Sequence, residues 1–306
     1  MDGSRDDPAI LIPRRFTRFA ALDWSGQAIP RPRGITLAEC TPGTTAPILT
    51  APDRGWSRPA VLDWLNAHAD AESDLLIGID FSPALPFRDC GGYFPHWSES
   101  PPDAPALWAL VDRLCAAEPH LSASTFAHHR DAGRHYRHAH GGTIHRGDLF
   151  EGSLGRLRVV ERLCRDLKIA PAISSFNLIG AAQVGKSSLT GMRLLHRLAG
   201  RVPIWPFAPV PAKGPLIVEI YTGIAARAAG RAAGRSKIRN PVDLDAALAA
   251  LETRPHAPLT RYDDHATDAI LSAAWLRHVA DDPALWNPPH LDATLACTEG
   301  WTFGVP

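Results

Sequence analysis

The feature that most constrains the fold of this chain is a short apolar segment that ends in an acidic residue and occurs three times. Segments 19–23, 75–80 and 216–219 read FAALD, LLIGID and LIVE. Aspartate has poor β-propensity and its charge resists burial, so Asp23 at the end of a core strand predicts a cationic partner. A single such residue is equally consistent with the start of a turn. The recurrence favours three strands, each with an acid at a similar position.

Composition limits the class of protein. The chain has 306 residues, of which 45% are hydrophobic and 21% charged, values typical of a globular protein. Thirty-two basic residues balance 32 acidic ones, so a nucleic acid or an anionic membrane would have to be held by a local patch. The five cysteines are dispersed and include no C-x-x-C pair, which argues against disulfides and thiolate zinc sites and indicates a reducing compartment.

The N-terminus predicts no targeting or membrane segment. Residues 1–15 are mostly polar with one short apolar run, and we expect a flexible tail followed by one domain over 16–306. No run approaches the ~18 apolar residues of a membrane-spanning helix. These observations predict a cytoplasmic protein without a membrane partner.

The first part of the chain predicts the order β-β-β-α-β. Acids fall on the first and fourth of these strands, which suits the opening of an RNase H-like fold. Pro59 fits the first turn of the helix, where its missing N–H costs little. The predicted elements are a strand at 17–23, an antiparallel strand at 34–40, a short strand at 46–49, a helix at 58–69 and a strand at 75–80.

Residues 87–150 do not continue this pattern of strands and helices, and we predict an insertion there. Proline at 83 and 86 ends the preceding strand, and a helix fits 106–117. Six of the fourteen histidines lie between His128 and His145. This tract suits a zinc site, a basic flap over a substrate or a solvated loop, and we favour the loop because no Cys/His spacing matches a structural zinc pattern.

Helix and strand patterns return after residue 152. A basic helix fits 157–167, and a short apolar run at 175–179 precedes a loop and a further helix. The remaining predicted elements are helices at 187–198, 242–251 and 264–279, a strand at 216–221 and an edge strand at 299–305.

The helix at 264–279 carries the most informative spacing. Asp264 and Asp268 are four residues apart and His265 and Asp268 three, so all three side chains can point to one side of the first turn. Capping and the helix dipole explain Asp263 and Asp264 equally well. They explain Asp268, a full turn inside the helix, less well.

These acids supply the oxygen ligands that Mg²⁺ or Mn²⁺ prefers. Two such ions can activate a water molecule and stabilise the leaving oxygen of a phosphodiester. Asp23 would bridge the metal ions, with Asp80 on one side and Asp268, together with Asp264 or His265, on the other. Glu219 would be a peripheral ligand or an orienting residue. We therefore predict Asp23, Asp80, Glu219 and Asp268 as catalytic residues.

At these residues the chain resembles the family known as domain of unknown function 429, regarded as predicted RNase H-like nucleases. The last helix is also similar to that of the Holliday-junction resolvases, whose two metal ligands three residues apart correspond to His265 and Asp268. Members of the family more often have an acid at the position of His265, so either His265 or Asp264 is the implied ligand. The matching segments are 21–26, 78–82, 180–189, 204–207, 218–221 and the helix around Asp268.

A competing motif lies at 180–187, which reads GAAQVGKS and satisfies the P-loop pattern G-x-x-x-x-G-K-[ST]. It follows a short apolar run and opens a helix, as a phosphate-binding loop requires. Only 306 − 187 = 119 residues follow it, which is little for the rest of a P-loop fold. Lys186 therefore remains a candidate phosphate contact, either for a nucleotide or for a nuclease substrate, beside the interpretation of an ordinary loop.

A basic stripe is the second candidate contact for phosphate. Arg227, Arg231 and Arg235 recur every four residues, so a helix there would present them on one face to a nucleic-acid backbone. Gly230 and Gly234 weaken the helix prediction. An ordinary solvated face is the alternative.

Taken together, the sequence predicts an α/β protein with an RNase H-like mixed sheet flanked by helices and an inserted His-rich segment. The predicted function is Mg²⁺- or Mn²⁺-dependent hydrolysis of nucleic-acid phosphodiester bonds. One alternative is a P-loop-like nucleotide-binding protein. The other is a non-catalytic RNase H-like module that binds a nucleic acid or a protein.

Overall fold

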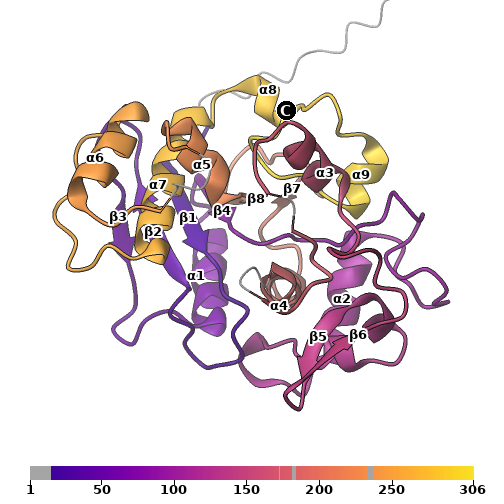
Figure 1. Ribbon diagram of the computed structural model, residues 1–306. Coiled ribbons are helices and arrows are strands. Elements are labelled where there is room, and N and C mark those ends of the chain that lie inside the picture. Colours follow the sequence, from indigo (N-terminus) through magenta and orange to yellow (C-terminus); the bar gives the residue numbers. More distant parts are fainter. Residues whose placement is uncertain (1–14, 172, 181–183, 233–236) are drawn as a thin grey trace, which may run out of the picture.

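A six-stranded mixed sheet forms the centre of the computed structural model, which describes residues 15–171, 173–180, 184–232 and 237–306 (Figure 1). Its strand order is β3-β2-β1-β4-β8-β7. The pairs β1–β2 and β2–β3 are antiparallel, whereas the pairs β1–β4, β4–β8 and β7–β8 are parallel. The strands are β1 (Arg18–Asp23), β2 (Thr36–Cys40), β3 (Ile48–Thr50), β4 (Leu75–Ile79), β7 (Ile204–Trp205) and β8 (Leu216–Glu219).

The register of the parallel strands brings their ends together. Leu22 of β1 lies beside Ile79 of β4, and Ile79 lies beside Glu219 of β8. Asp23 and Asp80 therefore follow directly at the same edge of the sheet. All residues of β4 and β8 are buried, as expected where helices cover both faces of parallel strands. The three predicted strands with acids at their ends are confirmed.

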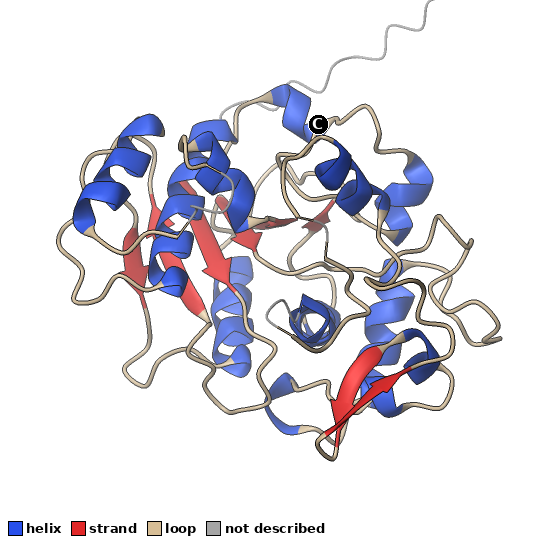
Figure 2. Ribbon diagram, in the orientation of Figure 1, coloured by secondary structure: helices blue, strands red, loops and turns tan. Residues whose placement is uncertain are grey.

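Helices cover both faces of this sheet (Figure 2). The predicted helices at 58–69, 242–251 and 264–279 are confirmed within one or two residues. The helices are α1 (Arg58–Asp70), α2 (Ala104–Leu114), α3 (Val159–Asp166), α4 (Val184–Arg197), α5 (Thr222–Ala228), α6 (Pro241–Ala250), α7 (Asp264–Val279), α8 (Pro283–Trp286) and α9 (Ala293–Thr298), with 3₁₀ turns η1 (Pro119–Leu121), η2 (Phe126–His128) and η3 (Ala132–His135).

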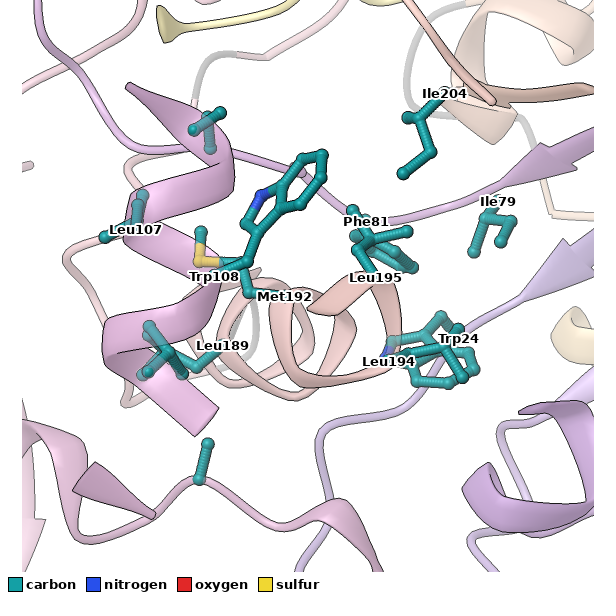
Figure 3. Packing of buried hydrophobic residues seen from close by; sticks show 14 of the residues in the cluster. Trp24, Ile79, Phe81, Leu107, Trp108, Leu189, Met192, Leu194, Leu195 and Ile204 are labelled. Atoms are coloured by element: carbon teal, nitrogen blue, oxygen red, sulfur yellow. The ribbon is translucent and has the colours of Figure 1, made fainter. Parts of the chain in front are cut away.

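Alternate residues of β1 face two different hydrophobic cores. Ala20 and Leu22 pack with α1, α2 and α4, whereas Phe19 and Ala21 pack with α5, α6 and α7. Figure 3 shows the first core, where side chains of α2 face those of α4. Each core excludes water from one face of the sheet, and the strand edge that carries the acids lies between them.

Helix α7 lies close against the sheet because small residues line the contact. Asp263 caps its N-terminus by accepting a hydrogen bond from the N–H of Ala266, and Ala269 and Ala273 are fully buried against the strands. On the sheet, a Cβ at Gly78 would lie 2.7 Å from a side-chain atom of Leu276, so only glycine fits there. The close packing fixes the first turn of α7 at the edge where β1 and β4 end.

The segment predicted as an insertion is folded into the first core. Tyr93, Phe94, Phe126 and Tyr136 are fully buried, and α2 packs on α4. The expectation of a loop at 128–145 is wrong, because η2, η3 and a hairpin of β5 (Arg137–His140) and β6 (Thr143–Arg146) form there, although most of the hairpin is exposed as expected. Whether the segment is an insertion within a smaller fold remains a prediction.

Two segments form only single bridges: the apolar run at 175–179 and the predicted edge strand at 299–305. Asn177 forms a bridge with Arg137, so segment 175–179 is not a strand of the six-stranded sheet. Thr302 pairs only with Glu219, beside the end of β8. Among the residues that the structure describes, no helix is both long and apolar enough to cross a lipid bilayer. The predicted tail at 1–15 lies, except for Arg15, outside the described residues.

Candidate active site

The ends of β1, β4 and β8 and the first turn of α7 bring acidic side chains to one place. Asp80 follows β4 in the middle of this group. Burial raises the pKa of Asp80 well above its usual range, and the nearby charges of Asp23, Asp268 and Glu219 raise it further. No hydrogen bond or ion pair to the Asp80 carboxylate is found within the described residues. Asp23, Asp80 and Asp268 therefore lie near enough for their charges to interact, and their predicted convergence as metal ligands stays a prediction.

A cavity of about 380 Å³ opens beside these acids. Asp80, Glu161 and Glu219 contribute carboxylates to its wall, and Lys186 and His265 lie on it as well. The loop after β1 forms another part of the wall. Gly26 in that loop is close to α4, because a Cβ there would lie 2.3 Å from the carbonyl carbon of Lys186. The cavity therefore joins the strand edge to the start of α4.

His265 and Asp23 form a close pair. His265 Nδ1 lies 2.5 Å from Asp23 Oδ2. Burial raises the pKa of Asp23, and the hydrogen bond from His265 lowers it by a smaller amount. The same hydrogen bond raises the pKa of His265 above its ordinary value. This hydrogen bond therefore holds the Asp23 carboxylate in one orientation beside His265, which lines the cavity.

Lys237 and Arg239 form ion pairs with the two acids of α7, Asp264 and Asp268. Lys237 Nζ lies 3.3 Å from Asp264 Oδ2 and 3.4 Å from Asp268 Oδ2, and Arg239 pairs with Asp264. The pKa of Asp264 is lowered by its hydrogen bond with Arg239. Burial raises the pKa of Asp268 to about 6 despite Lys237. Of the two candidates left open by the sequence, His265 contacts Asp23 and Asp264 faces these cations instead.

Glu219 differs from the other acids because an arginine holds it. Arg158 donates to both carboxylate oxygens of Glu219, at 2.5 and 2.8 Å, and Thr302 Oγ1 donates to Oε1 at 2.9 Å. The Arg158 side chain is 1% exposed and that of Glu219 6%. A carboxylate bound in this way has little capacity left for a metal ion. The structure therefore favours an orienting role for Glu219 over that of a peripheral ligand.

Arg158 is the centre of a larger buried network. Its Nε donates to Glu161 Oε1 at 3.0 Å, and its Nη1 donates to the carbonyl oxygen of Glu299. Burial alone would lower the pKa of Arg158, but the charges of Glu219 and Glu161 raise it above its ordinary value. The Glu299 carboxylate accepts from three backbone N–H groups, one of them at the start of α3. We call Arg158, Glu161 and Glu219 the arginine network.

Sequence reasoning missed this network. Arg158 and Glu161 are three residues apart, and this spacing could have indicated the ion pair between them. Nothing local links Arg158 to Glu219, which is 61 residues away. The contacts of Lys237 and Arg239 with Asp264 of α7 likewise have no local sequence signal.

The P-loop motif has only part of the structure it requires. Residues 181–183 lie outside the described residues. The N–H of Gly185 donates to the carbonyl oxygen of Asn177 at 3.3 Å, so it is not free for a phosphate. The preceding segment is not a strand of the sheet, as a P-loop needs. Lys186, in contrast, lines the cavity and keeps its predicted place near the acids.

The predicted basic stripe does not form as a helical face. Helix α5 ends at Ala228, and Gly230 has a φ of +76°, which breaks the helix between Arg227 and Arg231. Arg227 donates to the carbonyl oxygen of Lys168, and Arg231 pairs with Asp243 at 3.3 Å. Arg235 lies outside the described residues. The structure gives no support to a shared phosphate contact by these arginines.

The donor chemistry of the site fits a hard divalent cation. Asp23, Asp80 and Asp268 are oxygen donors whose pKa values are all raised, so together they hold negative charge that burial and repulsion penalise. A bound cation would relieve this penalty. Within the described residues, no three His, Cys, Asp or Glu groups already have a metal-binding arrangement. His265 and Lys237 are the groups that hold Asp23 and Asp268 in their present orientations.

Comparison with known proteins adds no assignment. No protein-family model matches the sequence, and no curated protein and no solved structure matches the chain.

Proposed function

We propose that this protein is a divalent-metal-dependent nuclease with RNase H-like architecture. The observation that carries the proposal is the position of Asp80, buried among the charges of Asp23, Asp268 and Glu219 with no described cation bonded to it. The strand order β3-β2-β1-β4-β8, antiparallel over its first three strands and parallel afterwards, supports the architecture expected from the sequence. The acids lie on its first and fourth strands, as that expectation requires.

The proposed roles follow from the contacts of each side chain. Asp23, Asp80 and Asp268 would hold Mg²⁺ or Mn²⁺, which when bound activates water and stabilises the leaving oxygen of a phosphodiester. His265 orients Asp23 through its 2.5 Å hydrogen bond. Lys186 lies on the cavity wall, where its ammonium group can attract an anionic substrate. The arginine network fixes the end of β8 and the start of α3 around the cavity.

Two observations favour other functions. Lys186 on the cavity wall is also what a nucleotide-binding protein would need, although the N–H of Gly185 is already bonded to Asn177. Lys237 pairs with both Asp264 and Asp268, so its ammonium group already supplies positive charge beside these acids, as expected for a module that binds a partner without metal. The two alternatives predict different activities, so one set of assays separates all three.

The test measures cleavage of labelled single- and double-stranded DNA and RNA with Mg²⁺, with Mn²⁺ and with EDTA, alongside ATP and GTP turnover. We expect cleavage that requires metal, is lost in Asp80→Asn and persists in Lys186→Ala. Nucleotide turnover that depends on Lys186 would support the nucleotide-binding alternative. Nucleic-acid binding without cleavage under every metal condition would support the non-catalytic module.

A further inference from the structure

Four histidines outside the candidate active site lie together on and beside the hairpin of β5 and β6. His138 and His140 are two residues apart in β5, so their side chains share one face of the hairpin. His145 of β6 is the cross-strand partner of His138 and lies on that same face. His128, at the end of η2, packs against His138 and His140. In Figure 1 this hairpin lies away from the six-stranded sheet.

The spacing of three of the ring pairs is close to that of ligands around a single ion. Nitrogen–metal bonds of ~2.0–2.1 Å place ring centroids about 3.2 Å from a metal ion, and so about 4.5–5.2 Å from one another at coordination angles of about 90–110°. The measured distances between ring centroids are 4.3 Å for His128–His140, 5.1 Å for His128–His138, 5.4 Å for His138–His145 and 6.3 Å for His140–His145. Three of these distances lie within about 0.2 Å of the expected range, whereas His140 and His145 are about 1 Å too far apart and would have to approach each other.

The chemical state of these rings favours ligation. The surrounding hollow, of about 490 Å³, includes one carboxylate, Asp148, and Arg134 pairs with it at 2.6 Å. Burial and neighbouring imidazoles lower the pKa values of His128 and His138, which keeps these rings neutral with a lone pair available. His138 Nδ1 is buried and has no hydrogen-bond partner within the described residues. A bound cation would satisfy a nitrogen that is otherwise unpaired.

We propose that His128, His138, His140 and His145 bind one divalent transition-metal ion of the Zn²⁺ class. Imidazole nitrogens suit Zn²⁺, Cu²⁺ and Ni²⁺, whereas Mg²⁺ and Mn²⁺ prefer oxygen, so this site differs in chemistry from the carboxylates. Among the described residues no three donor groups are already arranged around a metal position. Binding therefore requires the rings to turn about χ2, a broad torsion that redirects the nitrogens, and the exposed side chains of His140 and His145 to move closer together.

The proposed ion would connect the hairpin to η2 and stabilise a part of the cavity wall indirectly. Arg137 of β5 exchanges backbone hydrogen bonds with Phe176 and Leu178, at 3.0 and 2.8 Å. The next contact is between Asn177 and Gly185, at the start of α4. A metal ion that fixes β5 against η2 therefore restrains the segment on which α4 begins. The site is structural in this proposal, because it acts through the backbone contacts that join β5 to the start of α4.

The test is Zn²⁺ titration of the full-length protein without a histidine tag, followed by calorimetry and by thermal melting. We expect one Zn²⁺ ion per chain with a rise in melting temperature, and at least tenfold weaker binding in His140→Gln/His145→Gln. Both substituted residues are exposed, so the fold should persist, which far-ultraviolet circular dichroism checks. His128→Gln, also at an exposed residue, is a second variant expected to weaken binding.

Two controls separate this site from the carboxylates. His290→Gln changes an exposed histidine outside the cluster, and Asp80→Asn removes a carboxylate of the candidate active site. Both should bind Zn²⁺ at the hairpin as the wild type does. The proposal is overturned if the wild type binds no Zn²⁺, if the double variant binds it equally well, or if Asp80→Asn alone removes binding.

Discussion

Two groups of acids at the same sheet edge differ in how their charge is compensated. In the arginine network, Glu219 receives both N–H groups of the Arg158 fork, and the pair is nearly inaccessible to solvent. One strand away, Asp80 is buried without a described cation bonded to it. We call Asp23, Asp80 and Asp268 the carboxylate cluster. Every acid of the network is paired with Arg158, whereas in the cluster Asp23 pairs with His265, Asp268 pairs with Lys237 and Asp80 has no bonded cation among the described residues.

The comparison teaches that position at the end of a strand does not distinguish a structural acid from a candidate ligand. Glu219 and Asp80 follow similar apolar segments on adjacent strands. Removing one member of a buried pair leaves the other charge unpaired, whereas removing one of several repelling acids relieves repulsion. The two groups should therefore respond to neutral substitutions in opposite directions.

The largest expected effect is on stability, in Glu219→Gln. The change leaves Arg158 buried with a neutral partner, and loss of one member of a buried ion pair costs about 3–5 kcal/mol of unfolding free energy. Urea denaturation without metal measures this loss. Asp80→Asn is the matched control from the carboxylate cluster and should be no less stable than the wild type. Equal stability of the wild type and Glu219→Gln would remove the distinction between the two groups.

A smaller effect concerns pH. Burial raises the pKa of Asp268 to about 6, above its unfolded value near 3.8, so folding favours the protonated form. The wild type in EDTA should lose stability relative to Asp268→Asn as pH rises from 4 to 7, by about 2 kcal/mol. Denaturation of both proteins across that range measures the difference. A constant difference, or one that shrinks as pH rises, would show that Asp268 ionises without penalty.

The smallest expected effect is that of Lys186→Ala on cleavage. Lys186 lines the cavity but pairs with none of the acids in the carboxylate cluster. We expect metal-dependent cleavage to fall by no more than about tenfold, or ~1.4 kcal/mol. Initial rates at saturating metal test this, with Lys213→Ala, an exposed lysine that pairs with Glu72, as control. A loss as large as that of Asp80→Asn would make Lys186 part of the chemistry.

The sequence predicted those parts of the site that local patterns determine. The ends of β1 and β4 and the start of α7 follow from apolar runs and from the spacing of Asp264, His265 and Asp268, and the structure has these elements within one or two residues. The residue that forms an ion pair with each acid could not be predicted in the same way. Arg158 meets Glu219 only because α3 packs at the end of β8, a consequence of tertiary structure.

Two errors have a local physical cause. The basic stripe assumed a helix through Gly230, whose positive φ ends α5 instead. The tract at 128–145 was expected to be a loop because it lacks the Cys/His spacing of a structural zinc site, yet its alternation of residues forms a hairpin with three histidines on one face. In both cases backbone conformation, more than side-chain composition, decided the structure.

The most direct test of the account is the thermal stability of Asp80→Asn with and without Mn²⁺. If the carboxylate cluster is a metal site, the metal-free melting temperature should equal or exceed that of the wild type. Saturating Mn²⁺ should raise the wild-type melting temperature, since an ion at 100 times its dissociation constant contributes about 2.7 kcal/mol, and should leave Asp80→Asn unchanged. A large fall in the metal-free melting temperature of Asp80→Asn, with the Mn²⁺ response intact, would contradict the account.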